Sequence, residues 1–298
     1  MSQIISPTNW VVFAAVVFIW STTPLAIVFS SEGIDPYLNL SLRMALSALL
    51  LGGWFAYHQR KLPFNRDAIP THLAVGGVGI GLSMSLVYYA AQTLPSSWIA
   101  LIFGLTPLFT ALLEGFVFRS LRLSFFHWLG IILATIGIWI IFHDPSYHLT
   151  DHITLAMIAM IASTFFHALS ASLVKRLKHQ LAPVDTVMGG LLVAIPMTLV
   201  FWLLNGSNTP VNLASSAIMS LVYLAIIGSL AGFLLYYQVL TVFSATMSSF
   251  ITLLAPSLAL AWGLLINNEP ITASLLLGAC LILLGLTIFI VKPADKVQ

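Results

Sequence analysis

Charged residues and cysteine are both scarce in this 298-residue chain. Only 7% of the residues are charged, whereas about 25% are charged in a typical soluble domain. The single cysteine, Cys280, excludes an intrachain disulfide. The chain has no Gly-x4-Gly-Lys-Ser/Thr motif, which excludes ATP hydrolysis through such a loop. Because the net charge is only +2, nucleic acid is not an expected partner.

Hydrophobic runs fill most of the chain instead. Hydrophobic residues make up 59% of the sequence, and the mean hydropathy is +1.02. Since a membrane-spanning helix needs about 20 apolar residues, the length holds about ten spans and no appended soluble domain. We therefore expect an all-α integral membrane protein with ten transmembrane helices. The expected spans are Asn9–Phe29, Pro36–Tyr57, Pro70–Thr93, Ser96–Phe118, Leu123–Phe142, His152–Val174, Pro183–Leu204, Ala214–Val239, Ala245–Ile266 and Thr272–Val291.

The basic residues indicate an orientation for these spans. Lys and Arg gather in short cytoplasmic loops of membrane proteins. With the N-terminus inside, all of the 11 basic residues except Arg43 fall in inner loops, and Arg43 lies within the second span. We therefore expect a multi-pass protein of the cell inner membrane with both termini in the cytoplasm.

The second half of the sequence repeats features of the first. The matched features are Trp20-Ser21 with Phe166-His167, Tyr88-Tyr89 with Tyr236-Tyr237, Pro107 with Pro256, Gly130 with Gly278, and Gly137 with Gly285. The expected domains are therefore residues 9–142 and 152–291, each of five helices. Because five is odd, the second repeat has the opposite polarity to the first. Inverted repeats are characteristic of secondary transporters, whose substrate site lies near the midplane between the repeats.

Several of these motifs together resemble one family over essentially the whole chain. They are Trp20-Ser21-Thr22-Thr23-Pro24, Leu105-Thr106-Pro107-Leu108-Phe109, Leu254-Ala255-Pro256 and Glu269-Pro270. The chain resembles the EamA-type transporters of the drug/metabolite transporter superfamily. That resemblance implies a ten-helix bundle with a central cavity and transport of small organic metabolites, often export of amino acids. The first half departs from the pattern, because Phe118-Arg119-Ser120-Leu121 lacks the glutamate found at Glu269.

Three of the prolines inside expected spans are taken to mark helix kinks: Pro24, Pro107 and Pro256. Proline removes one helical hydrogen bond and frees the carbonyl four residues earlier. The freed carbonyls belong to Trp20, Phe103 and Thr252. We expect kinked helices that offer these acceptors to a substrate. The alternative is a structural kink whose carbonyls are satisfied by neighbouring Ser or Thr side chains.

Aromatic and polar side chains on the helices with matched features are the candidate substrate contacts. The candidates are Trp20, Ser21, Ser83, Tyr88, Phe103, Phe166, His167, Tyr236, Gln238 and Thr252, with Thr22 and Ser248 as further polar groups. Aromatic faces can stack on a planar ligand or hold a cation. Ordinary packing and hydrogen bonding between helices is the alternative for each of them.

Ionisable groups within the spans are functional hypotheses by default. Three of them are the candidates here: Arg43, Glu114 and His167. His167 suits a proton-coupled step or a hydrogen bond to substrate, with a satisfied bundle histidine as the alternative. Arg43 could bind a carboxylate, but a peripheral second span favours a structural role. Glu114 lies near the cytoplasmic edge and is expected to extend toward that interface, where basic loop residues lie nearby.

The leading hypothesis is a secondary transporter of small organic metabolites that works by alternating access. We expect export of an amino acid or related metabolite, with a riboflavin carrier as the alternative because the candidates include many stacking surfaces. Three scattered ionisable groups do not form an intramembrane catalytic set, and paired kinks without a filter ring do not favour a channel. We expect a monomer in the lipid bilayer that uses no cofactor or metal, including at the loop residues His143, His148 and His152.

Overall fold

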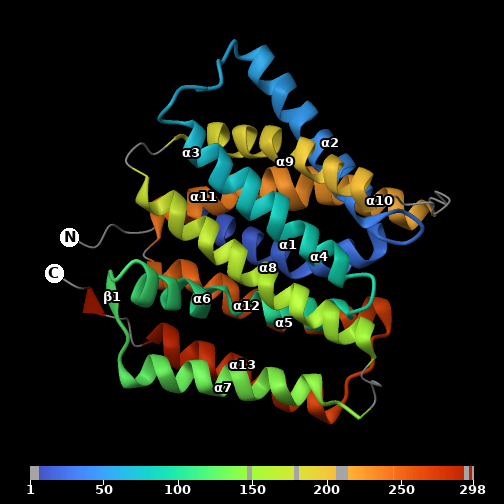
Figure 1. Ribbon diagram of the computed structural model, residues 1–298, viewed down its shortest axis with the longest axis vertical. Helices are drawn as coiled ribbons and strands as arrows, with labels where there is room; N and C mark the ends of the chain where they lie inside the picture. The colour runs from blue at the N-terminus through green and yellow to red at the C-terminus, as the bar shows by residue number, and fades with distance from the viewer. Residues whose placement is uncertain are drawn as a thin grey trace.

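The computed structural model describes residues 7–145, 150–177, 181–205, 214–243, 245–291 and 295–296, and it is almost entirely helical (Figure 1). Within these residues, ten helical segments are long and apolar enough to cross a membrane. This confirms the expected all-α class. One short antiparallel pair joins β1 (Leu121–Arg122) to β2 (Asp295–Lys296).

Seven spans are continuous in the described chain. They are α1 (Pro7–Ser30), α2 (Pro36–Tyr57), α7 (Phe125–Phe142), α8 (Asp151–Arg176), α9 (Pro183–Asn205), α12 (Ala245–Asn267) and α13 (Ala273–Val291). The other three are composite. The third comprises α3 (Ile69–His72), η1 (Leu73–Leu82) and α4 (Ser83–Ala90); the fourth comprises α5 (Ser96–Phe103), α6 (Thr106–Leu112) and η2 (Leu113–Val117); the eighth comprises α10 (Ser215–Tyr223), η3 (Leu224–Ala231) and α11 (Gly232–Val242).

Local sequence explains where several helices begin. The carboxylate of Asp35 accepts hydrogen bonds from backbone N–H groups at the start of α2, and Pro36 occupies the first helical position. Thr150 caps α8 in the same way through its hydroxyl oxygen. That helix also begins with Asp151 and ends with Arg176, so both charges complement its dipole.

Matched glycines allow α7 and α13 to lie against each other at one edge of the bundle (Figure 1). A Cβ added to Gly130 would lie 2.6 Å from the carbonyl oxygen of Gly285. A Cβ on Gly137 would lie 2.6 Å from the carbonyl oxygen of Gly278. Since real Cβ atoms do not approach so closely, only glycine permits this separation. In lipid, such close backbone packing replaces the hydrophobic effect as the force between helices.

The third and eighth spans each contain a π-helical segment, η1 and η3, at corresponding places in the two halves. A π-helical segment inserts an extra residue into a helical turn and commonly occurs at functional sites. The hydrophobic pattern of the sequence did not predict these segments. They shift the register of α4 and α11, whose side chains help to form the centre of the bundle.

The two halves pack through reciprocal contacts. From the first half, α1 packs on α12 and α2 packs on α9, while α8 from the second half packs on α4, α5 and α6. The first, third, fourth, sixth, eighth and ninth spans, which carry the matched sequence features, supply the described residues that line the central cavity, except for Arg43 of α2. The fifth and tenth spans form the α7–α13 edge, away from that centre (Figure 1).

Polar contacts join the halves at both ends of the bundle. At one end, called here the basic end, Arg60 pairs with Asp185 at 2.7 Å, and Arg176 pairs with Glu114. Glu114 is therefore buried in an ion pair, with Ser120 as a second partner. Glu114 thus extends to the basic end, as expected, and Arg176 is a basic residue near it; its carboxylate is buried in that ion pair and is not open to solvent.

At the opposite end, Glu269 binds the N-terminus of α5. Its carboxylate accepts hydrogen bonds from the backbone N–H groups of Ser96 and Ser97 at 2.8 and 3.1 Å, and from the Ser96 hydroxyl at 2.7 Å. Burial raises the pKa of Glu269, but these hydrogen bonds and one from Asn267 outweigh it and hold the pKa below its ordinary value. Glu269 is thus an ionised cap for a helix of the other half.

Candidate substrate site

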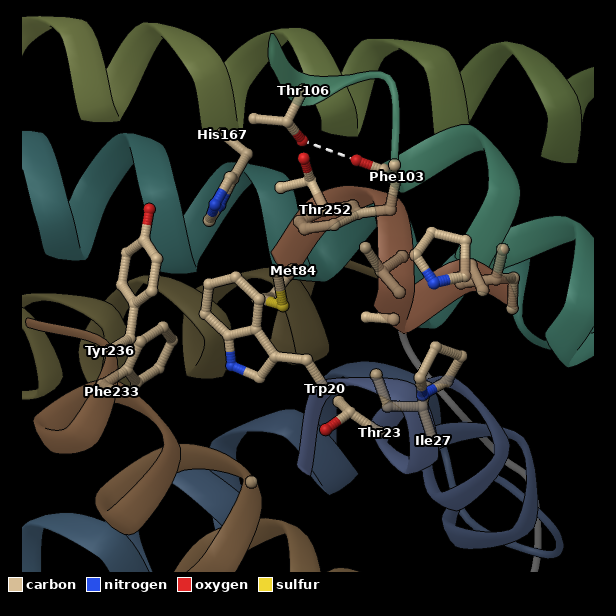
Figure 2. A pocket seen from close by; sticks show the side chains of 18 of the residues that line it. Trp20, Thr23, Ile27, Met84, Phe103, Thr106, His167, Phe233, Tyr236 and Thr252 are labelled. Carbon is tan, nitrogen blue, oxygen red and sulfur yellow. Dashed lines mark hydrogen bonds between the residues drawn. The ribbon is translucent and has the colours of Figure 1, made fainter. Parts of the chain in front are cut away.

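A cavity of about 130 Å³ lies between the two halves. The first half contributes Trp20, Pro24 and Phe103, from α1 and α5. The second half contributes His167, Tyr236 and Pro256, from α8, α11 and α12. Figure 2 shows side chains from these helices converging on one space. The wall is mostly apolar, with a few polar groups among the aromatic rings.

Five of the predicted contact residues line this cavity: Trp20, Phe103, His167, Tyr236 and Thr252. Two aromatic pairs connect the halves within it. The ring centroids of Trp20 and Tyr236 lie 4.5 Å apart, and those of Phe103 and His167 lie 4.8 Å apart. Each ring is therefore held by a neighbour from the other half, which gives the cavity a preformed aromatic surface.

The proline helices meet at the cavity wall. Pro24 and Pro256 both line it, and a Cβ on Gly104 would lie 2.8 Å from the Pro256 ring. Gly104 therefore lets the fourth span cross the ninth at its proline. It also marks the break between α5 and α6, where the chain leaves the helix before Thr106.

Pro107 lies outside the cavity lining, near the start of α6. The carbonyl of Phe103, which this proline was expected to free, accepts a hydrogen bond from the Thr106 hydroxyl at 2.6 Å (Figure 2). Thr106 belongs to the same span as Phe103. The geometry at Phe103 thus follows the structural alternative for a proline kink, although Thr106 itself lines the cavity.

The other predicted contacts lie outside the lining and mostly bind other helices. Ser83 and Ser163 share a hydrogen bond of 3.0 Å. Ser21 accepts one from Trp262 at 2.9 Å. Tyr88 is fully buried behind the cavity, whereas Gln238 is exposed. Phe166 packs edge-on to its neighbour Phe165.

Further polar candidates follow the same pattern. Thr22 shares a hydrogen bond of 2.6 Å with Tyr223. The side chain of Ser248 lies outside the described residues, as does His148 of the loop histidines. Across the part of the chain that the structure describes, no group of three His, Cys, Asp or Glu side chains has the arrangement of a metal site.

His167 presents an unpaired polar atom at the cavity. Its Nδ1 is buried and has no hydrogen-bond partner among the described residues. Figure 2 shows the ring pointing into the cavity that Trp20 and Tyr236 also line. Buried polar atoms are normally satisfied, so this ring nitrogen is available to a bound molecule.

Arg43 also reaches the cavity, although the second span was expected to be peripheral. The side chain is 2% exposed and lines the wall. Its Nε donates to the Ser229 hydroxyl at 2.8 Å, and its Nη1 donates to the Tyr88 hydroxyl at 3.3 Å. A long side chain thus carries the charge from α2, between η3 and α4, to the centre.

Sequence reasoning missed some lining residues altogether. They include Thr23, Met84, Gly104, Thr106 and Phe233. Thr23 and Thr106 adjoin Pro24 and Pro107, so proximity to the kinks could have indicated them. Met84 and Phe233 are each the second residue after a π-helical segment, in α4 and α11. Their direction depends on the inserted residue, which hydropathy does not show.

Comparison with known proteins agrees with this architecture. The model of the EamA-like transporter family matches residues 9–143 and 154–291, and each match contains five of the ten spans. An uncharacterized transporter of Archaeoglobus fulgidus is 25% identical over 285 residues, which are 95% of this chain and 99% of that protein. A "Probable amino-acid metabolite efflux pump" of Escherichia coli is also 25% identical over 285 residues, with 92% and 91% of the two chains covered.

A solved crystal structure has the same fold. It superposes with a TM-score of 0.66 over 94% of this chain and 96% of that one, at 16% sequence identity. The family matches cover both halves, and the named relatives are transporters over nearly their full lengths. The chain is therefore a multi-pass membrane transporter, not an enzyme, and it belongs to the EamA-like transporter family of the drug/metabolite transporter superfamily.

Proposed function

We propose that this protein is a secondary transporter that exports amino acids or related metabolites by alternating access. The observation that carries this proposal is the cavity at the interface of the halves, because each half supplies part of its wall. A site between inverted repeats can open to either side when one half rocks against the other. The named efflux pump among the relatives supports the export of amino-acid metabolites.

The contacts at the two ends of the bundle fit such a cycle. The Arg60–Asp185 and Arg176–Glu114 pairs join the halves at the basic end, while Glu269 joins them at the other end. Opening at either end requires only the contacts at that end to separate. We further propose, from the loop charges, that the basic end faces the cytoplasm. We also propose that the protein is a monomer in the inner membrane of the cell.

Flux measurements test this function. Purified protein in proteoliposomes is expected to move labelled tryptophan or threonine saturably, with inhibition by excess unlabelled compound. The Trp20–Tyr236 ring pair favours a flat molecule as a second candidate, so labelled riboflavin is tested in parallel. Saturable riboflavin flux without amino acid flux would instead identify a vitamin carrier. A steady ionic current through the protein would overturn alternating access.

A further inference from the structure

Arg43 places a buried positive charge at the cavity wall. The described residues contain two ion pairs, Arg60–Asp185 and Arg176–Glu114, and both lie at the basic end. Within that part of the chain, Arg43 is held by two neutral hydroxyls instead of a carboxylate. Removing a cation from water without a counter-ion is unfavourable. An anion in the cavity would relieve that cost.

The guanidinium is oriented to receive such an anion. Nε and Nη1 are used by Ser229 and Tyr88, which fix the plane of the group. The third nitrogen, Nη2, lies next to Gly228, where an added Cβ would be 3.5 Å away, and Gly228 also lines the cavity. A guanidinium has five N–H groups, so hydrogen bonds remain for a carboxylate, the anion that arginine binds best together with phosphate.

The rest of the described wall carries no acidic side chain. Among the described residues that line the cavity there is no Asp or Glu, so the ammonium of an amino acid would find no carboxylate among them. Trp20, Ile27, Phe103 and Phe233 instead form an apolar and aromatic surface. A molecule with one carboxylate and an apolar body balances the charge of Arg43, whereas a zwitterion leaves the site with a net positive charge.

We propose that Arg43 binds the carboxylate of the substrate, and that the cavity selects organic monocarboxylates with an aromatic or branched apolar body over zwitterions. This inference rests on the proposed function, since it takes the cavity as the substrate site. Within the proposed substrates, it favours the related metabolites, meaning acids that lack an ammonium group, and makes the zwitterionic amino acids weaker ligands.

A binding experiment on the purified protein tests this selection without requiring transport. The ligands are indole-3-acetate, its neutral amide, tryptophan and tryptamine, with benzoate and 3-methylbutanoate as smaller acids. Binding is measured by calorimetry and by the shift in melting temperature. The wild type is expected to bind indole-3-acetate at least about tenfold more tightly than the amide or tryptophan. The charged hydrogen bonds from Arg43 require a carboxylate, which the amide lacks and which tryptophan offers only together with an ammonium group.

Variants assign the preference to Arg43. Arg43→Gln is expected to bind acid and amide equally, and Arg43→Lys is expected to retain part of the preference because it keeps the charge but not the planar fork. Arg66→Gln, an exposed loop arginine, is the control and should behave as wild type. If Arg43→Gln does not fold, the wild-type ligand series still decides the proposal.

Three results would overturn the inference: equal binding of acid and amide by the wild type, tryptophan binding as tightly as indole-3-acetate, or no binding of any of the three acids. A folded Arg43→Gln protein that keeps the preference for the acid would also overturn it. Flux measurements in proteoliposomes distinguish a failure of the Arg43 inference from a failure of the proposed transport function. Tryptophan flux that is independent of Arg43 would support the transport function and reject the Arg43 inference. Selective acid binding without any flux would support the Arg43 inference and reject the transport function.

Discussion

Trp20 forms part of the aromatic surface of the cavity, and its ring is held in place by a residue of the other half. Its indole contacts Tyr236 across the interface of the halves, with ring centroids 4.5 Å apart, and both rings line the cavity. A bound molecule would therefore meet an indole whose orientation is already fixed. Fixed aromatic surfaces bind ligands with little loss of side-chain freedom, so much of their contact area contributes to affinity.

Replacing this indole should weaken substrate binding. Trp20→Ala is expected to raise the KM for tryptophan or indole-3-acetate by about tenfold, since an aromatic contact contributes roughly 0.5–1.5 kcal/mol beyond its buried area. Trp20→Phe should show a smaller increase. The measurement is the initial rate of uptake into proteoliposomes against substrate concentration. Trp139→Ala on α7, where the indole is exposed, is the matched control, and an equal KM change there would contradict a specific role for Trp20.

The sequence predicted residues such as Trp20, Phe103 and His167 because each lies at mid-depth on a span with repeated features. It could not predict which face of a helix meets the cavity. Ser83 lies at a suitable depth, yet its hydroxyl binds Ser163 on α8. Arg43 shows the reverse, because the length of its side chain brings a charge from α2 into the centre. Depth follows from counting residues, but direction depends on how the helices pack.

At the scale of single elements, the α7–α13 pair depends on the absence of side chains at four glycines. Gly137→Ala is expected to lower the free energy of unfolding by about 1–3 kcal/mol, the usual range for an overpacked contact, because its Cβ would lie 2.6 Å from a backbone carbonyl oxygen. Gly53→Ala on α2 is the control, since no described atom lies within 4 Å of its added Cβ. Thermal unfolding in detergent measures both variants. If Gly137→Ala and Gly53→Ala melt at the same temperature, α7 and α13 can move apart to accept the added Cβ without loss of stability.

The cap on α5 leads to a pH-dependent prediction. Glu269→Gln should reduce stability at pH 7 by about 1.5–3 kcal/mol, because it removes hydrogen bonds to a charged acceptor. The folded pKa of Glu269 lies below the ordinary value of 4.5. Its ionised form therefore stabilises the folded protein fully above that value, and the contribution is lost as the pH falls through the lowered folded pKa.

The difference in melting temperature between wild type and Glu269→Gln should accordingly narrow as the pH falls below 4.5. Glu32→Gln, an exposed acid in the loop before α2 at the same end, should show no difference at any pH. If this difference in melting temperature stays constant from pH 7 to pH 3, Glu269 stabilises α5 through the shape of its side chain and not through its charge.

Element boundaries also show what hydropathy can and cannot predict. The spans were predictable because each must be about 20 apolar residues long. The π-helical segments η1 and η3 were not, since one inserted residue leaves the composition of a span unchanged. The break before α6 was foreshadowed by Pro107, but Pro256 lies within a continuous α12. Proline thus has different consequences in the two halves: the fourth span breaks between α5 and α6, whereas α12 continues through its proline.

At the scale of the whole molecule, the two ends differ in how the halves are joined. Two ion pairs join them at the basic end, whereas Glu269 binds a helix terminus at the other. The first half has no glutamate equivalent to Glu269, and Ser120 near that position binds Glu114 and Arg176 instead. The chain is therefore a symmetric fold with asymmetric ends, so the two opening steps differ in the bonds that must separate.

The Arg60–Asp185 pair tests whether these end contacts control transport. Arg60 donates from Nε and Nη2 to the two carboxylate oxygens at 2.9 and 2.7 Å, and the hydrogen bond to Asp185, followed by its charge, raises the pKa of Arg60. Asp185→Arg places two cations together and is expected to hold the basic end apart. Transport should then fall by about an order of magnitude, since a repelled end seldom closes and each cycle requires closure.

Charge reversal on both sides restores the attraction. The double variant Arg60→Asp/Asp185→Arg is therefore expected to recover at least part of the flux, while Arg60→Asp alone, which opposes two carboxylates, should be as slow as Asp185→Arg. Exchange of labelled substrate in proteoliposomes at matched protein content measures all four proteins, and the coupling between the two positions follows from the cycle. Additive losses, with the double variant slower than either single one, would mean that the pair only holds the loop after α2 in place. Recovery would instead connect this contact to the opening and closing of the cavity.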